Sequence, residues 1–94
     1  LMTTQRVTTE HLEAIVTRIN MITNSPLNMY ESIYGKYVVG CYHLSQAYGG
    51  FALHRITNTS GGTSDVLSVG HVPKKELAQL MHAFIRGLNA AQEV

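Results

Sequence analysis

Two lysines follow the expected start of the second helix, at Pro73. A helix start exposes free N–H groups and a positive dipole end, and the residue before it is usually Ser, Thr, Asp or Asn. The expected N-cap here, Val72, has no side-chain oxygen, and Lys74 and Lys75 lie in the first turn. A bound anion would accept the free N–H groups and pair with both lysines and with His71. The sequence therefore predicts an anion site. The alternative is a helix end capped by water, with two solvated lysines.

Two glycine pairs flank one expected strand, Gly49–Gly50 before it and Gly61–Gly62 after it. Glycine permits positive φ and lets the backbone approach a ligand closely. Neither pair matches a phosphate-loop or dinucleotide-binding fingerprint, and both also fit ordinary hairpin turns. Arg55 lies on the strand between them, and its charge needs a partner if it is buried. That partner is expected to be Asp65 across the hairpin or a ligand phosphate.

The other candidates would contact the base of a nucleotide. Aromatic side chains stack on any nucleobase, and Tyr42 and Tyr48 are placed to do so. Asn58 and the backbone of the second glycine pair would recognise polar edges of the ligand. The complete predicted binding set is Lys74, Lys75, Arg55, His71, Asn58, Gly61, Gly62, Tyr42 and Tyr48.

Three side chains in the middle of the chain are of metal-ligating type. Cys41 and His43 would share a face if they lie on one strand, and His54 would oppose them on the paired strand. No CxxC, HxxxH or second cysteine pair accompanies them, and a lone cysteine is most often a small buried apolar group. The sequence therefore predicts neither a metal nor a cofactor. It leaves open whether these three residues bind a metal.

The sequence contains few of the residues that catalysis requires. The serines lack the GxSxG pattern of a nucleophile elbow. The six acidic residues do not form a close pair in the central part of the chain, where acid–base catalysis would need one. We therefore expect a protein that is not an enzyme.

Two amphipathic helices must hold these residues in place. The first is expected at about residues 8–23, with Thr8 as its N-cap and with Glu13 and Asn20 on or near its polar face. The second is expected at about 73–91, where Gly87 indicates close packing near its end. Apolar residues at helical spacing support both helices: Leu12, Ile15, Val16, Ile19 and Ile22 in the first, and Leu77, Leu80, Met81, Phe84, Ile85 and Leu88 in the second.

The segment between the helices, about residues 30–69, is typical of an antiparallel sheet. Runs rich in β-branched and aromatic residues predict strands at 37–44 and 51–57, a short strand at 65–68 and a possible edge strand at about 30–34. The fold class is therefore α+β, with an N-terminal helix, a meander of three to four strands and a C-terminal helix. Both helices are expected on one face of the sheet.

Length and composition limit the remaining possibilities. The 94 residues allow a single domain, 1–94, and one cysteine cannot form an internal disulfide. No apolar run is long enough to cross a membrane, and the first ten residues lack the apolar core of a signal peptide, so a cytoplasmic location is expected. The net charge of +1 argues against nucleic-acid binding, which usually uses a strongly basic face. Only 14% of the residues are charged. The sheet also carries too many large apolar side chains to fit on one side of a core: Val38, Tyr42, Phe51 and Leu53. Both observations predict at least a dimer.

Short motifs extend across most of the chain: YHLS at 42–45, YGG at 48–50, LHR at 53–55, GG at 61–62 and GHVPK at 70–74. This pattern resembles small tailed-phage proteins, most of them uncharacterised. A second similarity, in size and in phosphate-compatible groups without catalytic ones, is to phage anti-defence sponge proteins of the anti-Thoeris and anti-CBASS type. Those sponges are homo-oligomers that sequester cyclic nucleotide or cyclic ADP-ribose immune signals without cleaving them.

The resemblance implies an anti-defence protein that binds such a signal in the cytoplasm of the infected bacterial host. Its partners would be the small-molecule signal and further copies of itself, with no membrane. Two alternatives stay open: a protein-interaction inhibitor that blocks a host defence enzyme, and a small DNA-binding regulator.

Overall fold

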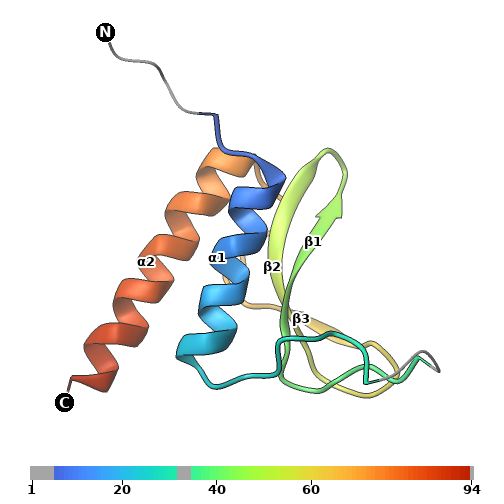
Figure 1. The fold of residues 1–94 in the computed structure, drawn as a ribbon. Coiled ribbons are helices and arrows are strands. Elements are labelled where there is room, and N and C mark those ends of the chain that lie inside the picture. The colour runs from blue at the N-terminus through green and yellow to red at the C-terminus, as the bar shows by residue number, and fades with distance from the viewer. Residues whose placement is uncertain (1–5, 32–34, 94) are drawn as a thin grey trace, which may run out of the picture.

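Two helices lie on one face of a three-stranded antiparallel sheet (Figure 1). The structure is a computed structural model, and it describes residues 6–31 and 35–93. This arrangement confirms the predicted α+β fold with a helix, a meander and a second helix. The elements in chain order are α1 (Thr9–Ile22), β1 (Tyr42–Ala47), β2 (Gly50–Ile56), β3 (Thr63–Asp65) and α2 (Lys74–Gln92).

The strands are shorter or shifted relative to the predicted ones. The run 37–44 becomes a strand only from Tyr42, because Val38 to Cys41 form a turn in which Gly40 has φ 96°. The third strand ends at Asp65 rather than beginning there, since the chain turns again before Ser68 (φ 57°). Of the possible edge strand, Tyr30 forms an isolated bridge with Tyr37, and residues 32–34 lie outside the described residues.

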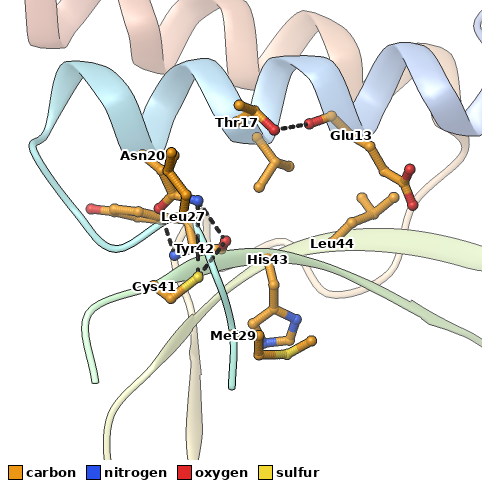
Figure 2. A pocket seen from close by; sticks show the side chains of 10 residues that line it. Glu13, Thr17, Asn20, Leu27, Met29, Cys41, Tyr42, His43 and Leu44 are labelled. Atoms are coloured by element: carbon orange, nitrogen blue, oxygen red, sulfur yellow. Dashed lines mark hydrogen bonds between the residues drawn. The ribbon is translucent and has the colours of Figure 1, made fainter. Parts of the chain in front are cut away.

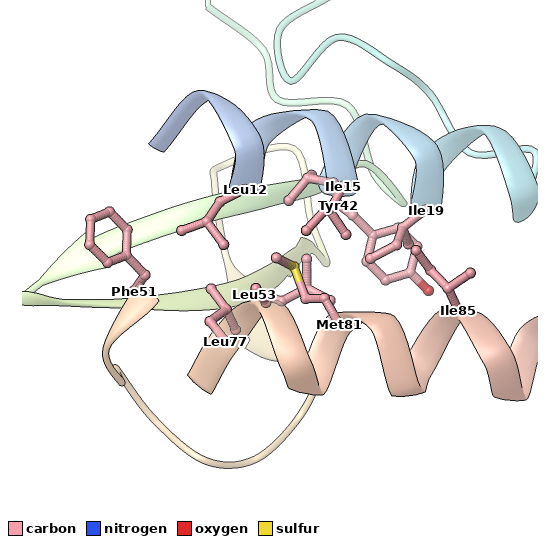
Figure 3. Close-up of a cluster of buried hydrophobic side chains, with 11 residues drawn as sticks. Leu12, Ile15, Ile19, Tyr42, Phe51, Leu53, Leu77, Met81 and Ile85 are labelled. Carbon is pink, nitrogen blue, oxygen red and sulfur yellow. The ribbon is translucent and has the colours of Figure 1, made fainter. Parts of the chain in front are cut away.

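The core fills the space between the two helices and the sheet (Figure 3). Leu12 of α1, Leu53 of β2 and Leu77 of α2 are fully buried there. Tyr42, Phe51 and Leu53 all belong to this one cluster. Three of the four side chains that were expected to exceed one side of a core therefore fit in it, because the sheet directs them toward the helices, whereas Val38 lies in the turn before β1.

The helix ends were predicted with mixed success. The Thr8 hydroxyl accepts the N–H of His11, which confirms it as the N-cap of α1. The N-cap of α2 is Pro73, one residue later than expected, and no side chain caps this helix. A Cβ on Gly87 would meet no atom within 4 Å, so the expected close packing there is wrong. Across residues 6–31 and 35–93, no helix combines the length and apolarity needed to cross a membrane.

The chain between β3 and α2 returns to the edge of β2. Val66 donates its N–H to the carbonyl of Leu53, and Val72 exchanges two hydrogen bonds with Phe51, at 2.8 and 2.9 Å. Residues 67–71 bulge out between these two points. Since Val72 packs against the core with Phe51, the preceding residue, His71, lies on the opposite face of the sheet.

Candidate functional site

The nine predicted binding residues lie in three separate places. Tyr48, His71, Lys74 and Lys75 gather where the β1–β2 hairpin turns and α2 begins, a region we call the hairpin end. The other end of β2 carries Arg55, which is paired with Tyr42 of β1 and lies four positions from Phe51, or about 13 Å along the strand. The loop before β3 carries the remaining three. The binding set therefore does not surround one small ligand as a whole.

The loop residues Asn58, Gly61 and Gly62 hold one another in place. The Asn58 side-chain oxygen accepts the N–H groups of Ser60 and Gly62 at 3.0 and 2.9 Å. A Cβ on Gly61 would lie 2.7 Å from the ring of Tyr37, so this glycine is required by packing. The contacts of this loop account for all three residues without a ligand.

Arg55 contacts groups at its own end of the sheet. Its Nε donates to the carbonyl of Gly40 at 3.1 Å, and its guanidinium carbon lies 4.7 Å from the centre of the Tyr42 ring. The register places Ser64 opposite Arg55, whereas Asp65 lies opposite His54 and accepts the N–H of Gly70 at 2.8 Å. In place of the expected pairing with Asp65, Arg55 contacts Gly40 and Tyr42. Arg55 is exposed, so its guanidinium charge stays in water.

Tyr42 is part of the core. It is 7% exposed, and its ring lies 6.2 Å from that of Phe84 in α2. Its packing against Phe84 and Arg55 leaves little ring surface for a nucleobase.

Tyr48 occupies an unusual position at the tip of the hairpin. Tyr48 and Gly49 form the two-residue turn, and both have positive φ, 55° and 75°. A turn of this type favours Asn-Gly, because most side chains are strained at positive φ. The Tyr48 side chain is 98% exposed, so packing within the chain does not compensate for this strain.

The start of α2 lies next to this turn. Pro73 offers no side-chain oxygen, and the first main-chain hydrogen bond of the helix is donated by Leu77 to its carbonyl. A helix start without a side-chain cap presents the N–H groups of its first turn, here residues 74–76, to solvent or to an anion. Lys75 is exposed, and the Lys74 ammonium lies 5.5 Å from the centre of the Phe51 ring.

A row of aromatic rings runs from Tyr48 across the face of the sheet that is turned away from the helices. Tyr48, His71, His54 and His43 stand edge to face, with successive ring centres 6.0, 5.6 and 5.7 Å apart. Ser45 joins the row through a 3.0 Å contact between its Oγ and Nε2 of His71. We call these four rings the aromatic row.

The sheet register creates most of this row. His43 and His54 are directly paired across β1 and β2, as the sequence predicted when it placed them on facing strands. His71 was assigned to the helix start alone. It reaches the row because the chain re-pairs with β2 at Val72, a long-range bridge that no local pattern encodes.

Burial lowers the pKa of His43 and of His54 below the ordinary histidine value. For His43, a hydrogen bond involving the Leu44 backbone raises the pKa and the neighbouring His54 lowers it. For His54, the Asp65 carboxylate raises the pKa and His71 lowers it, but burial prevails. Both imidazoles are therefore neutral at pH 7.

Cys41 lies apart from the two histidines. Its thiol is 1% exposed and lies 4.0 Å from the Asn20 side-chain nitrogen, on the α1 side of the sheet (Figure 2). Burial raises the pKa of the Cys41 thiol, and the contact with Asn20 offsets part of this increase. The side chain of His43 points away from α1, so the two residues do not share a face as expected.

A groove between α1 and β1 was not foreseen from the sequence. Its volume is about 320 Å³, and of the predicted binding residues only Tyr42 borders it. The available signal was the position of Asn20 four residues after Val16, which continues the helical spacing of the apolar residues of α1. The groove is lined by Glu13, Val16, Thr17, Asn20, Leu27, Met29, Cys41, Tyr42, His43 and Leu44 (Figure 2).

Comparison with known protein families, with curated proteins and with solved structures found no match for this chain.

Proposed function

We propose that this protein binds a cyclic nucleotide or cyclic ADP-ribose immune signal at the hairpin end without cleaving it, as an anti-defence sponge. The observation that carries the proposal is Tyr48, which is 98% exposed at positive φ beside an uncapped helix start. A strained residue that no packing requires points to a role outside the fold. We place this activity in the cytoplasm of an infected bacterial host.

The start of α2 would hold the phosphates. Two groups of donors lie at the helix start itself: the free N–H groups of the first turn and the ammonium groups of Lys74 and Lys75. The imidazole of His71 lies beside them, on the sheet face turned away from the helices. Hydrogen bonds to a charged phosphate are stronger than those between neutral groups. The Lys74 ammonium lies over Phe51 and forms no ion pair with any described residue, so it is able to turn toward an anion.

Tyr48 would hold the base. Its ring stands at the outer end of the aromatic row, 6.0 Å from the ring of His71, and its exposed face is open to stacking. Base stacking on an aromatic side chain contributes about 1–3 kcal/mol per base. The base and the phosphates would thus be bound by neighbouring groups of the hairpin end.

Binding without cleavage agrees with the surroundings of Ser45 and His71. Their side chains lie 3.0 Å apart, but within the described residues no carboxylate hydrogen-bonds to His71. A hydrolytic serine needs such an orienting group and an oxyanion hole. The proposal therefore treats Ser45 as the group that orients His71.

The thermal stability of the protein with a panel of cyclic nucleotides and cyclic ADP-ribose tests this function. A ligand at 100 times its Kd stabilises the folded state by about 2.7 kcal/mol. Chromatography of the ligand released by heating would return it unchanged. The absence of a shift with every ligand at millimolar concentration, or a released product of different mass, would refute the proposal.

A second candidate function, inhibition of a host defence enzyme by direct contact, is favoured by a set of exposed apolar side chains. They lie at the end of α1 and in the segment that follows it. A host protein captured in stoichiometric amount from a bacterial lysate would support this candidate. The exposed residues are Met21, Leu27, Val39 and Tyr30.

We also propose that the protein forms a homo-oligomer, as the resemblance implies. The edge strand β1 contains no lysine or proline, the residues that usually block pairing with a second chain. Light scattering at micromolar concentration tests this, and the mass of a monomer would contradict it.

A further inference from the structure

Three side chains of metal-ligating type lie next to one another across the sheet, and we call these three the ligand row. His43 of β1 is paired with His54 of β2, and His54 is paired with Asp65 of β3. Directly paired residues of an antiparallel sheet project from the same face, with their Cβ atoms about 5 Å apart. The ring centres of His43 and His54 are 5.7 Å apart.

Two atoms of this row are buried without a hydrogen-bond partner among the described residues. They are Nε2 of His43 and Oδ1 of Asp65, on either side of His54. The other carboxylate oxygen, Oδ2, accepts the N–H of Gly70 at 2.8 Å and fixes the side chain. A buried polar atom without a partner costs about 1–3 kcal/mol, so a ligand that satisfies these atoms would be favoured.

The charge of the row suits a cation rather than a phosphate. Both imidazoles are neutral at pH 7, because burial lowers the pKa of each, and a neutral imidazole is the form that coordinates a metal. The basic side chains of Arg55 and Lys74 contact Tyr42 and Phe51 of the helix-covered face. The Asp65 carboxylate supplies the negative charge.

We propose that His43 and His54 together bind one transition-metal dication of the zinc, nickel or copper class, with Asp65 as the adjacent counter-charge. Imidazole nitrogen is a preferred ligand of these ions. In the described part of the chain no three histidine, cysteine or acidic side chains already converge on one point. The ion therefore takes two protein ligands, and water completes its coordination sphere.

This site borders the hairpin end at His71, whose ring centre lies 5.6 Å from that of His54, but it does not include Cys41. It uses neither lysine of the α2 start, and the Cys41 thiol lies on the α1 side against Asn20. Variants of the two lysines therefore test the nucleotide site without changing a proposed metal ligand. Loss of nucleotide binding in a Lys74 variant leaves the metal proposal unaffected.

Titration calorimetry of untagged protein with Zn²⁺ tests the proposal. We expect one ion per chain, with binding abolished in His43→Gln and in His54→Gln. Asp65→Asn keeps an acceptor for Gly70 but removes the charge, and it should weaken binding about 10- to 100-fold. Melting curves recorded without metal establish that each variant is folded.

The chain offers a matched control in a second histidine pair. His11 of α1 and His82 of α2 have ring centres 6.2 Å apart, also edge to face. Among the described residues, the buried side-chain atoms that lack a hydrogen-bond partner do not include a nitrogen of either histidine. The double variant His11→Gln, His82→Gln should bind Zn²⁺ as the wild type does. Loss of binding in this control, or its retention in the His43→Gln, His54→Gln double variant, would overturn the proposal.

A spectroscopic measurement on the wild type keeps the proposal testable if a histidine variant fails to fold. The electron paramagnetic resonance spectrum of bound Cu²⁺ reveals coordinated imidazole nitrogens. Two nitrogens support the site. Fewer than two, or no bound Cu²⁺ at micromolar concentration, would contradict it.

Discussion

The side-chain amide of Asn20 hydrogen-bonds both main-chain groups of Tyr42 and so takes the place of a neighbouring strand at the edge of β1. Its Nδ2 donates to the Tyr42 carbonyl at 3.0 Å, and the Tyr42 N–H donates to its Oδ1 at 2.8 Å. Asn20 is 2% exposed. This pair fastens α1 to the sheet beside the groove.

Replacement of Asn20 by alanine should therefore be strongly destabilising. Two buried main-chain groups of Tyr42 would lose their partners, at about 1–3 kcal/mol each, and we expect a total loss of about 2–6 kcal/mol. Urea unfolding measures this loss. Asn28→Ala changes an exposed asparagine and should stay within about 0.5 kcal/mol of the wild type. Equal effects of the two substitutions would contradict the role of Asn20.

The Cys41 thiol should make stability fall at alkaline pH. Burial raises its pKa in the folded state, so the unfolded chain releases this proton first as the pH rises. The contribution is complete well below 9.0, the ordinary pKa of a thiol, and is lost above it at up to about 1.4 kcal/mol per pH unit.

Urea unfolding of the wild type and Cys41→Ala at pH 7 and pH 9.5 checks this dependence. The difference between the two pH values should be smaller in Cys41→Ala, because tyrosines and lysines contribute equally to both proteins. Identical differences would show that the Cys41 pKa is not raised. The folded wild type should also react slowly with a thiol reagent, since the thiol is 1% exposed.

The helices were predictable because their apolar positions repeat at the helical period. Thr8 and the stripe through Leu12 and Ile19 define α1 from local sequence alone. The same pattern misplaced Asn20, which was expected on or near the polar face and is buried. A polar side chain in a helix is expected to face solvent. Asn20 is buried instead because it hydrogen-bonds the main chain of Tyr42, which is distant in sequence.

The candidate site was harder to predict for the same reason. The pairing of His43 with His54 follows from the alternation of adjacent strands. The position of His71 depends on the bridge between Phe51 and Val72, which only the folded chain creates. Arg55 and Asn58 were included because of their chemical type, but each has partners within its own turn or strand end.

Gly87→Ala should stabilise the protein by about 0.5–1 kcal/mol. Glycine in a helix interior costs about this much relative to alanine, and a Cβ at this position meets no atom within 4 Å. Gly50→Ala is the matched comparison, because its Cβ would lie 2.9 Å from the main-chain carbon of His71. Thermal unfolding should show opposite changes for the two substitutions, and a lower melting temperature for Gly87→Ala would contradict the prediction.

Tyr48→Asn should raise stability and remove ligand binding. Asparagine tolerates positive φ better than tyrosine, and Asn-Gly is the preferred sequence of this turn, so we expect a gain of about 0.5–1 kcal/mol. The lost base stacking should weaken the best nucleotide of the thermal panel at least about 5-fold, since about 1 kcal/mol of stacking is removed.

The control for this variant is Tyr48→Phe. It keeps the aromatic face and the strain, and it should bind the nucleotide like the wild type with unchanged stability. If Tyr48→Asn binds as well as the wild type, Tyr48 has no part in the site. If Tyr48→Phe loses binding, the hydroxyl rather than the ring contacts the ligand.

The double substitution Lys74→Glu, Lys75→Glu should abolish nucleotide binding and leave the fold intact. Two charges beside the phosphates are reversed, and each lost charge-assisted hydrogen bond costs about 1.5–3 kcal/mol. Stability should change by only a few tenths of a kcal/mol. Acidic residues suit a helix start, and this gain offsets the lost contact between the Lys74 ammonium and the Phe51 ring.

Titration with the best nucleotide, alongside a melting curve, separates the possible roles of the two lysines. Arg18→Glu, Arg86→Glu makes the same charge change at exposed positions of α1 and α2, and it should bind nearly as the wild type does. Equal weakening in both double variants would mean that only long-range attraction is lost, and the site at the start of α2 would be refuted. Unfolding of the Lys74→Glu, Lys75→Glu variant would make the lysines structural. Loss of binding in a stably folded protein is the one result that assigns them to the phosphate site.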